Sequence, residues 1–175
     1  YLLKYSNIFE VLQPNRYYSD GVQKRWNKYF SLSQKKIYQY DSCLIAEKDY
    51  SFVNTVCFEG MLIHRNVIDK IGYPDRRFFI SGDDTIYGYL ANMQTNICLV
   101  RDAKMIRAKK SNEELLTPMY IYYSVRNFHL FEEYYMKYYG SVSYPFGVKF
   151  RYFITNLYSI FLIIINKHYN LSKKI

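Results

Sequence analysis

Segments typical of strands and of helices alternate along the chain up to about residue 110, and only segments typical of helices follow. The runs "IFEVLQPN", ended by Pro14, and "SFVNTVCFEGMLIHR", broken near Gly60, predict short strands because they are apolar and bounded by turn residues. "NVIDKIG" predicts a short helix, and "DTIYGYLANMQ" predicts a longer one with Ile86, Leu90 and Met93 on one face. "NICLVRDAKMIRA" predicts a pair of strands. This mixture predicts an α/β fold with a mixed sheet.

The rest of the chain predicts two helices. The stretch "SNEELLTPMYIYYSVRNFHLFEEYYMKYYG" is expected to form the first, capped by Ser111 or Asn112 and closed by Gly140. The stretch "GVKFRYFITNLYSIFLIIINKHYNLSKKI" is expected to form the second. We therefore expect a body over residues 1–110 and a helical extension over residues 111–175.

The last predicted helix contains an apolar run from Leu157 to Ile165 that only Ser159 interrupts. The run is shorter than the roughly 20 residues that span a bilayer. Apolar and aromatic residues with a basic rim predict a helix lying in a membrane interface, and packing on the chain's own core is the alternative. The rim consists of Lys149, Arg151, Lys167, Lys173 and Lys174.

The formal net charge of +9 suits a polyanionic partner, which could be nucleic acid, a nucleotide diphosphate or anionic lipid, although surface solubility explains it equally well. The three cysteines, Cys43, Cys57 and Cys98, form neither a zinc-type pair nor a disulfide framework, so we expect a reducing, cytoplasmic setting and small core side chains. The chain begins at Tyr1 rather than at a methionine, and we expect an N-terminal portion to precede it in the whole protein.

The adjacent carboxylates of Asp83 and Asp84 in "FFISGDDTIYGYL" allow three interpretations. One aspartate could cap the following helix. The pair could hold the metal ions of a nucleic-acid polymerase, where Gly-Asp-Asp lies in a hairpin. That chemistry needs a partner aspartate on an upstream strand, and Asp20, Asp41 and Asp49 all lie in polar, loop-like contexts. The third interpretation, a catalytic base, depends on the neighbouring residues.

The order "FEGMLIHRNVIDKIGYPDRRFFISGDDTIYGYLANM", followed by "YYSVRN" at residues 122–127, resembles the acceptor-side half of family 2 glycosyltransferases. These enzymes have a GT-A fold, and the chain is most similar to their rhamnosyl- and galactofuranosyl-transferase-like branch over roughly residues 9–130. The resemblance implies a partial GT-A fold with a mixed sheet plus C-terminal helices, in which the nucleotide-binding half lies upstream.

The resemblance also implies roles for the carboxylates. Inverting sugar transfer needs a carboxylate that takes the proton from the acceptor hydroxyl while the nucleoside diphosphate leaves. Asp84 would be this base, and Asp83 would position the acceptor or hold Asp84. The positive end of the helix favours the ionised form of both carboxylates, so capping and catalysis are compatible.

Further acceptor- or donor-binding residues are implied at Glu59, Gly60, Gly82 and Arg126. Gly60 would let the backbone approach the sugar closely, and an ordinary bulge is its alternative. Arg126 could pair with the diphosphate, or it could form an ion pair with Glu132 or Glu133.

The sequence departs from the family in three places. The Asp-x-Asp that holds metal and nucleotide sugar is absent, so a divalent cation (Mg or Mn) would depend on the upstream portion, and no metal ligand is expected in this chain. Ile86 and Leu90 stand where the family often has an acid and an arginine. Arg107 stands near the position of a family histidine, where it could neutralise a diphosphate without metal.

The sequence thus predicts part of an inverting glycosyltransferase of bacterial cell-envelope polysaccharide synthesis. It would move a sugar from a nucleotide-sugar donor to a lipid-linked or glycan acceptor, at the inner face of the cell membrane and without nucleic acid. One alternative is a non-catalytic acceptor- or membrane-binding domain, and the other is the polymerase-type enzyme.

Overall fold

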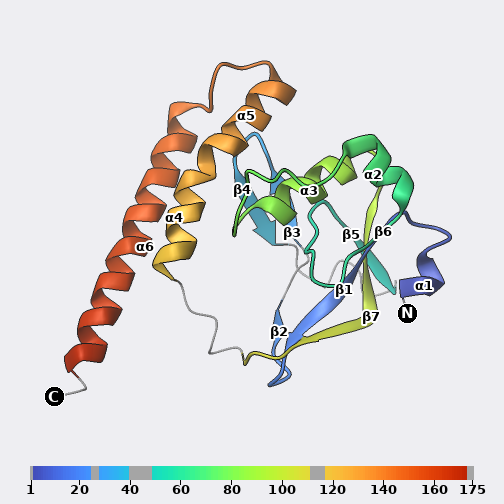
Figure 1. Ribbon diagram of the computed structural model, residues 1–175, viewed down its shortest axis with the longest axis horizontal. Helices are drawn as coiled ribbons and strands as arrows, with labels where there is room; N and C mark the ends of the chain where they lie inside the picture. Colours follow the sequence, from blue (N-terminus) through green and yellow to red (C-terminus); the bar gives the residue numbers. More distant parts are fainter. Residues whose placement is uncertain (1, 25–27, 40–48, 111–116, 173–175) are drawn as a thin grey trace. The chain divides into compact units, whose positions relative to one another are not determined.

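The computed structural model describes most of the chain and divides it into two compact units. The described residues are 2–24, 28–39, 49–110 and 117–172. The first unit, here called the sheet unit, comprises residues 1–31, 36–76 and 83–114. The second, the helical unit, comprises residues 32–35, 77–82 and 115–175. The protein is mixed α/β, with a mixed sheet and several helices (Figure 1).

The sheet unit is built around β1 and β7, which pair in parallel. The other three strands of this sheet pair antiparallel, β2 and β6 with β1 and β5 with β7, so the sheet is mixed as predicted. The strands are β1 (Val11–Tyr18), β2 (Gln23–Lys24), β5 (Tyr50–Val53), β6 (Leu62–Ile63) and β7 (Ile97–Arg107). A separate antiparallel pair consists of β3 (Lys28–Ser31) and β4 (Lys36–Gln39).

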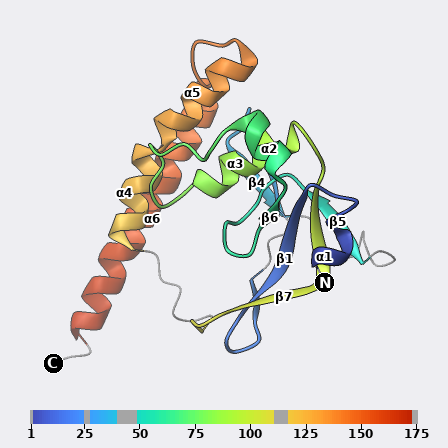
Figure 2. The same cartoon turned by 45° about the vertical axis from the view of Figure 1, so that its right-hand side comes forward.

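Helices pack on the sheet through side chains that alternate between its faces. Along β7, Ile97 and Leu99 join one buried cluster, whereas Cys98 and Val100 join another. The first cluster includes residues of the helices α2 (Arg65–Ile71) and α3 (Asp83–Asn92), which lie over one face of the sheet (Figure 2). The second includes Tyr5 of the helix α1 (Leu2–Tyr5). The sheet is therefore buried on two faces, and α3 is held on one of them.

Two strand predictions were wrong because partner strands override local signals. β1 continues through Pro14 to Tyr18, with a shift of register between Pro14 and Asn15. The predicted pair of strands at "NICLVRDAKMIRA" is one strand, β7, which bulges at residues 101–103, where the pairing to β1 skips. Asn15 Nδ2 donates a hydrogen bond to the Arg101 carbonyl at 2.6 Å and so fills the bulge.

The two predicted helices of the sheet unit are confirmed, but the buried face of α3 is wider than expected. α2 ends at Gly72, whose backbone N–H donates to the Ile68 carbonyl. Ile86 of α3 is buried, whereas Met93 lies beyond the helix end and is half exposed. The close packing of Gly88 against the backbone of residues 55–56 buries the neighbouring turn of α3 as well.

The helical unit contains α4 (Pro118–Arg126), α5 (Phe128–Tyr139) and α6 (Phe146–Ser172). The single helix predicted before Gly140 is thus divided at Asn127, while Gly140 ends α5 as predicted. The predicted caps Ser111 and Asn112 lie outside the described residues. Thr117 caps α4, since its Oγ1 accepts a hydrogen bond from the Tyr120 backbone N–H at 3.2 Å.

The second predicted helix is confirmed as α6, which runs beside α4 and α5 (Figures 1 and 2). The ring of Tyr152 on α6 stacks on Phe128 with 4.3 Å between centroids, and its hydroxyl donates to the Ser124 carbonyl on α4. These contacts fix the side of α6 that faces the neighbouring helices.

Candidate catalytic carboxylates and their surroundings

Asp83 and Asp84 occupy the first turn of α3, where the positive end of the helix favours negative charge. The three residues before them, Ile80, Ser81 and Gly82, all have positive φ angles of 46°, 92° and 97°. Two of these residues carry side chains, which makes the conformation costly unless the surroundings impose it. The aspartates therefore follow a constrained turn.

Contacts within the helical unit hold this turn. The buried Asn127 donates hydrogen bonds from Nδ2 to the carbonyls of Phe79 and Ser81, at 3.3 and 2.8 Å. A Cβ atom at Gly82 would lie 2.6 Å from the ring of Phe131, so both the φ angle and the available space require glycine. The turn is thus held by residues far along the chain, from the junction of α4 and α5 and from α5 itself.

The carboxylate of Asp84 is partly buried, and its pKa is raised to about 6. Burial is the main cause, and the adjacent charge of Asp83 is the second. Hydrogen bonds from Thr85 and the charge of Arg16 oppose the increase. A carboxylate that titrates near pH 6 can accept a proton in neutral solution and release it again easily, which suits a general base.

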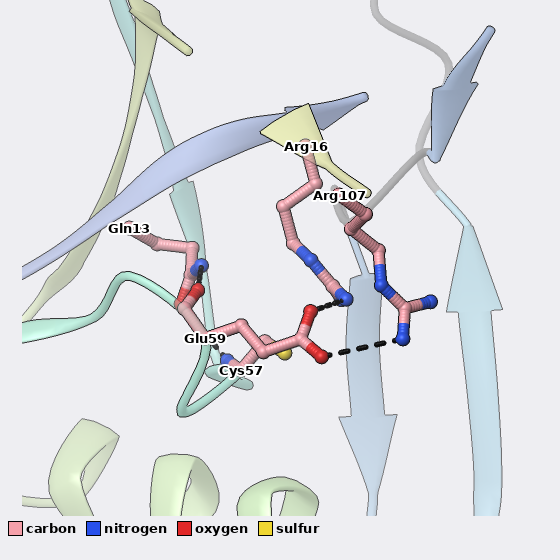
Figure 3. A network of polar contacts seen from close by, with 5 residues as sticks. All are labelled: Gln13, Arg16, Cys57, Glu59 and Arg107. Atoms are coloured by element: carbon pink, nitrogen blue, oxygen red, sulfur yellow. Dashed lines mark hydrogen bonds and ion pairs between the residues drawn. The ribbon is translucent and has the colours of Figure 1, made fainter. Parts of the chain in front are cut away.

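The carboxylate of Glu59 forms ion pairs with two arginines (Figure 3). Its Oε2 is paired with Arg16 of β1, and its Oε1 lies 3.3 Å from the guanidinium of Arg107 at the end of β7. The Arg16 side chain is only 3% exposed, whereas that of Glu59 is 43% exposed. Two guanidinium groups thus share one carboxylate, and the positive charge of Arg16 also acts on Asp84. This cluster could therefore stabilise a developing anion.

Gln13, a fully buried residue of β1, fixes the loop that carries Glu59 (Figure 3). Its Oε1 accepts a hydrogen bond from the Cys57 backbone N–H at 2.8 Å, and its Nε2 donates to the Glu59 carbonyl at 3.5 Å. Burial raises the pKa of the Cys57 thiol to about 11, so this cysteine is a neutral core residue in neutral solution. Cys98 is buried as well, and Cys43 lies outside the described residues.

Gly60 follows in a turn between β5 and β6 rather than in a bulge of paired strands. It has a φ angle of 82°, and a Cβ atom would lie 2.5 Å from Met105 Sδ and 2.9 Å from Pro14 Cγ. The close approach is therefore to the strands β1 and β7. Whether a sugar also approaches this backbone stays a prediction.

Of the residues predicted for the site, Asp83, Asp84, Glu59 and Gly60 belong to the sheet unit. Gly82 and Arg126 belong to the helical unit, where Arg126 donates a hydrogen bond to the Arg77 carbonyl. The two acids suggested as its alternative partners are placed elsewhere: Glu132 lies 2.8 Å from Lys149, and Glu133 lies 2.6 Å from Arg77. The diphosphate role of Arg126 stays a prediction.

Sequence reasoning missed Arg16, Gln13 and Asn127. The signal for Arg16 and Gln13 was their place beside apolar residues in a predicted strand region. A charge or an amide in such a place is buried only when it has polar partners. Asn127 is the last residue of the motif "YYSVRN". No local feature of the sequence indicates that its side chain forms hydrogen bonds with a turn some 46 residues earlier.

Among the residues that the structure describes, no three His, Cys, Asp or Glu side chains form a group that could hold a metal ion. No protein-family model matches the chain, and no curated protein or solved structure matches it either. A proposal about function therefore depends on the chemistry of the side chains and on the order of motifs in the sequence.

Proposed function

We propose that the chain is part of an inverting glycosyltransferase of the GT-A type in which Asp84 is the general base. The observation that carries the proposal is the carboxylate of Asp84, partly buried in the first turn of α3, with a pKa raised to about 6. The charged cluster of Arg16, Glu59 and Arg107 belongs to the same unit. The motif order described above supplies the reaction class.

In this reaction the acceptor hydroxyl forms a bond to the anomeric carbon of the donor sugar while the bond to the nucleoside diphosphate breaks. Asp84 accepts the hydroxyl proton, and the electron pair of the broken bond leaves with the diphosphate. Burial, and next the charge of Asp83, raise the pKa of Asp84 to about 6, which allows proton exchange near neutral pH. Arg16 and Arg107 provide positive charge that can attract an anionic group.

A divalent cation, Mg or Mn, would stabilise the leaving diphosphate, and we expect its ligands outside the described residues. The roles proposed for Asp83 and Asp84 do not require it. Partners on this proposal are a nucleotide-sugar donor and a lipid-linked or glycan acceptor, used in bacterial cell-envelope polysaccharide synthesis at the cytoplasmic face of the membrane.

The placement of the aspartates favours sugar transfer over the polymerase alternative. A polymerase Gly-Asp-Asp lies between two strands, whereas Asp83 and Asp84 here begin a helix. In this position the positive end of the helix favours the ionised carboxylate, which is the form that accepts a proton.

The test uses the protein encoded by the complete reading frame. A panel of nucleotide sugars is screened for donor hydrolysis, and the active donor is then used in transfer assays with lipid-linked acceptors. We expect turnover with at least one donor and its loss in Asp84→Asn. Donor and acceptor binding without turnover under any condition would instead support a non-catalytic binding domain.

A further inference from the structure

The exposed side chains of α6 are apolar along one broad side of the helix. At 100° per residue they lie within an arc of about 160°, here called the apolar face of α6. Phe146 is 81% exposed and Phe161 is 57% exposed, so the described residues of the helical unit leave these large side chains uncovered. The face consists of Phe146, Phe150, Phe153, Ile154, Leu157, Tyr158, Ile160, Phe161, Ile164 and Ile165.

Between Phe146 and Ile165, the polar side chains of α6 lie outside this arc, and those of Thr155, Asn156 and Ser159 form hydrogen bonds within the helix. Asn156 Nδ2 donates to the Tyr152 carbonyl at 2.8 Å, and Tyr152 contacts Ser124 of α4. Thr155 and Ser159 each donate a hydrogen bond to the carbonyl four residues earlier, both at 2.9 Å. A surface helix of a water-soluble protein has the opposite arrangement, with its polar face outward. Hydroxyl groups bonded to their own helix are suited to a medium that offers no hydrogen bonds.

Charge is placed around the apolar face rather than on it. No charged residue occurs from residue 152 to residue 166. Lys149 and Arg151 lie just beyond the two edges of the face, close to its N-terminal end. From residue 117 to the end, the sequence has seven basic and two acidic residues. This pattern matches a bilayer with anionic head groups, where the basic residues would lie next to the head groups and the apolar face would contact the acyl chains.

The helix is long enough, by length and composition alone, to cross a membrane between Phe146 and Ile165, and none of that window is buried. A helix that crosses the bilayer alone would have lipid on every side. One side of α6 instead packs on α4 and α5 through Tyr152 and carries the ion pair of Lys149 with Glu132. This asymmetry favours a helix with one face in lipid and the other on protein.

We propose that α6 lies in the plane of an anionic bilayer surface, with its apolar face among the acyl chains and α4 and α5 on its aqueous side. The proposal does not depend on glycosyl transfer. Loss of vesicle binding and loss of catalysis are separate measurements, so either proposal can fail without the other.

The first experiment measures flotation of the full chain with vesicles of phosphatidylcholine alone or mixed with phosphatidylglycerol. We expect binding to the anionic vesicles. The double variant Phe153→Glu with Leu157→Glu should lower the bound fraction at least tenfold, because two apolar side chains lose their burial in lipid. The control Thr155→Glu places the same charge on the same helix outside the face and should change binding less than twofold. Circular dichroism verifies that each variant is folded.

The second experiment distinguishes lying in the plane from crossing. The single native tryptophan is removed by Trp26→Phe, and one tryptophan is introduced as Phe150→Trp, Leu157→Trp or Ile164→Trp. Quenching by lipids brominated at different depths should give the three positions the same depth. Depths that differ by about 21 Å between residues 150 and 164 would overturn the in-plane orientation. If the chain does not bind vesicles, lipid does not cover the apolar face of α6. The same conclusion follows if the chain is a dimer that the double variant dissociates.

Discussion

The two units of the chain differ in the groups for which burial or exposure is most costly. The sheet unit buries Gln13, Arg16 and Asn54 to 2% exposure or less, and each has a specific hydrogen-bond partner. The helical unit leaves large apolar side chains such as Phe153 and Leu157 about half exposed. Buried polar groups are costly unless they hold a defined geometry, and exposed apolar groups are costly unless something covers them. Buried polar groups therefore indicate a site of defined geometry, and exposed apolar side chains indicate a surface that binds a partner.

The largest expected effect tests the chemical half of this comparison. Asp84→Asn removes the proton acceptor but keeps the size of the side chain, so sugar transfer should fall by about 100- to 10,000-fold. Donor affinity should be retained, since the side chain acts on the acceptor. The rate of transfer and the donor dissociation constant are the two measurements.

Asp69→Asn is the matched control, because Asp69 is exposed and pairs with the likewise exposed Arg65 four residues away in α2. Its activity should stay within twofold of the wild type. Full activity of Asp84→Asn would show that Asp84 is not the general base. The buried polar groups of the sheet unit would then have only a structural role.

A smaller effect is expected on stability from the turn before the aspartates. Gly82→Ala forces a side chain into a positive φ angle and against the ring of Phe131, at a cost of about 2–4 kcal/mol. Gly21→Ala serves as the control, since Gly21 has a similar φ angle of 80° but open space around it. Urea unfolding should show the larger loss for Gly82→Ala. Equal losses would mean that Phe131 does not restrict the turn.

Local signals in the sequence predicted the fold class and most helices. The periodic apolar residues of α2 and α3 and the terminating glycines, Gly72 and Gly140, act through neighbours in the sequence, so they could be recognised there. The continuation of β1 through Pro14 could not, because it depends on pairing with β7 more than 80 residues later. The GT-A type stays a prediction.

The candidate site was only partly predictable for the same reason. Asp83 and Asp84 were visible as an adjacent pair at a helix start. The contact of Arg16 with Glu59 joins residues 43 positions apart, and the hydrogen bonds of Asn127 reach back further still. Such partners follow from the tertiary fold rather than from any local pattern.

The coupling between the two aspartates provides a third test, with an effect on the pH profile rather than on the limiting rate. The charge of Asp83 raises the pKa of Asp84, so Asp83→Asn should lower it. Because the base must be ionised, kcat/KM should rise with pH through about 6 in the wild type and at a lower pH in the variant. An unchanged profile would show that another group controls the acidic limb.

Besides the buried Asn127, Lys35 is an exception to the comparison, because the helical unit partly buries its cationic side chain. Its ammonium lies 3.9, 4.9 and 5.1 Å from the ring centroids of Tyr152, Phe131 and Phe128, and Arg151 donates a hydrogen bond to the Lys35 carbonyl at 3.4 Å. Burial, and next the charge of Arg151, lower the pKa of Lys35 to about 7, although the rings attract the charged form.

The smallest effect is therefore expected in the pH dependence of stability. An unfolded lysine has a pKa near 10.4, so between about pH 7 and 10.4 the unfolded chain binds more protons and the contribution of Lys35 to the free energy of unfolding rises with pH. Below pH 7 both states are charged, and the cost of burial is fully present. Lys35→Met should thus stabilise the protein most at pH 6 and least at pH 9.5, as measured by urea unfolding. The control Lys36→Met changes an exposed lysine and should give the same difference at both pH values. A Lys35→Met difference that is constant with pH would mean that the lysine is as well solvated as its neighbour, and Lys35 would then no longer be an exception to the contrast between the units.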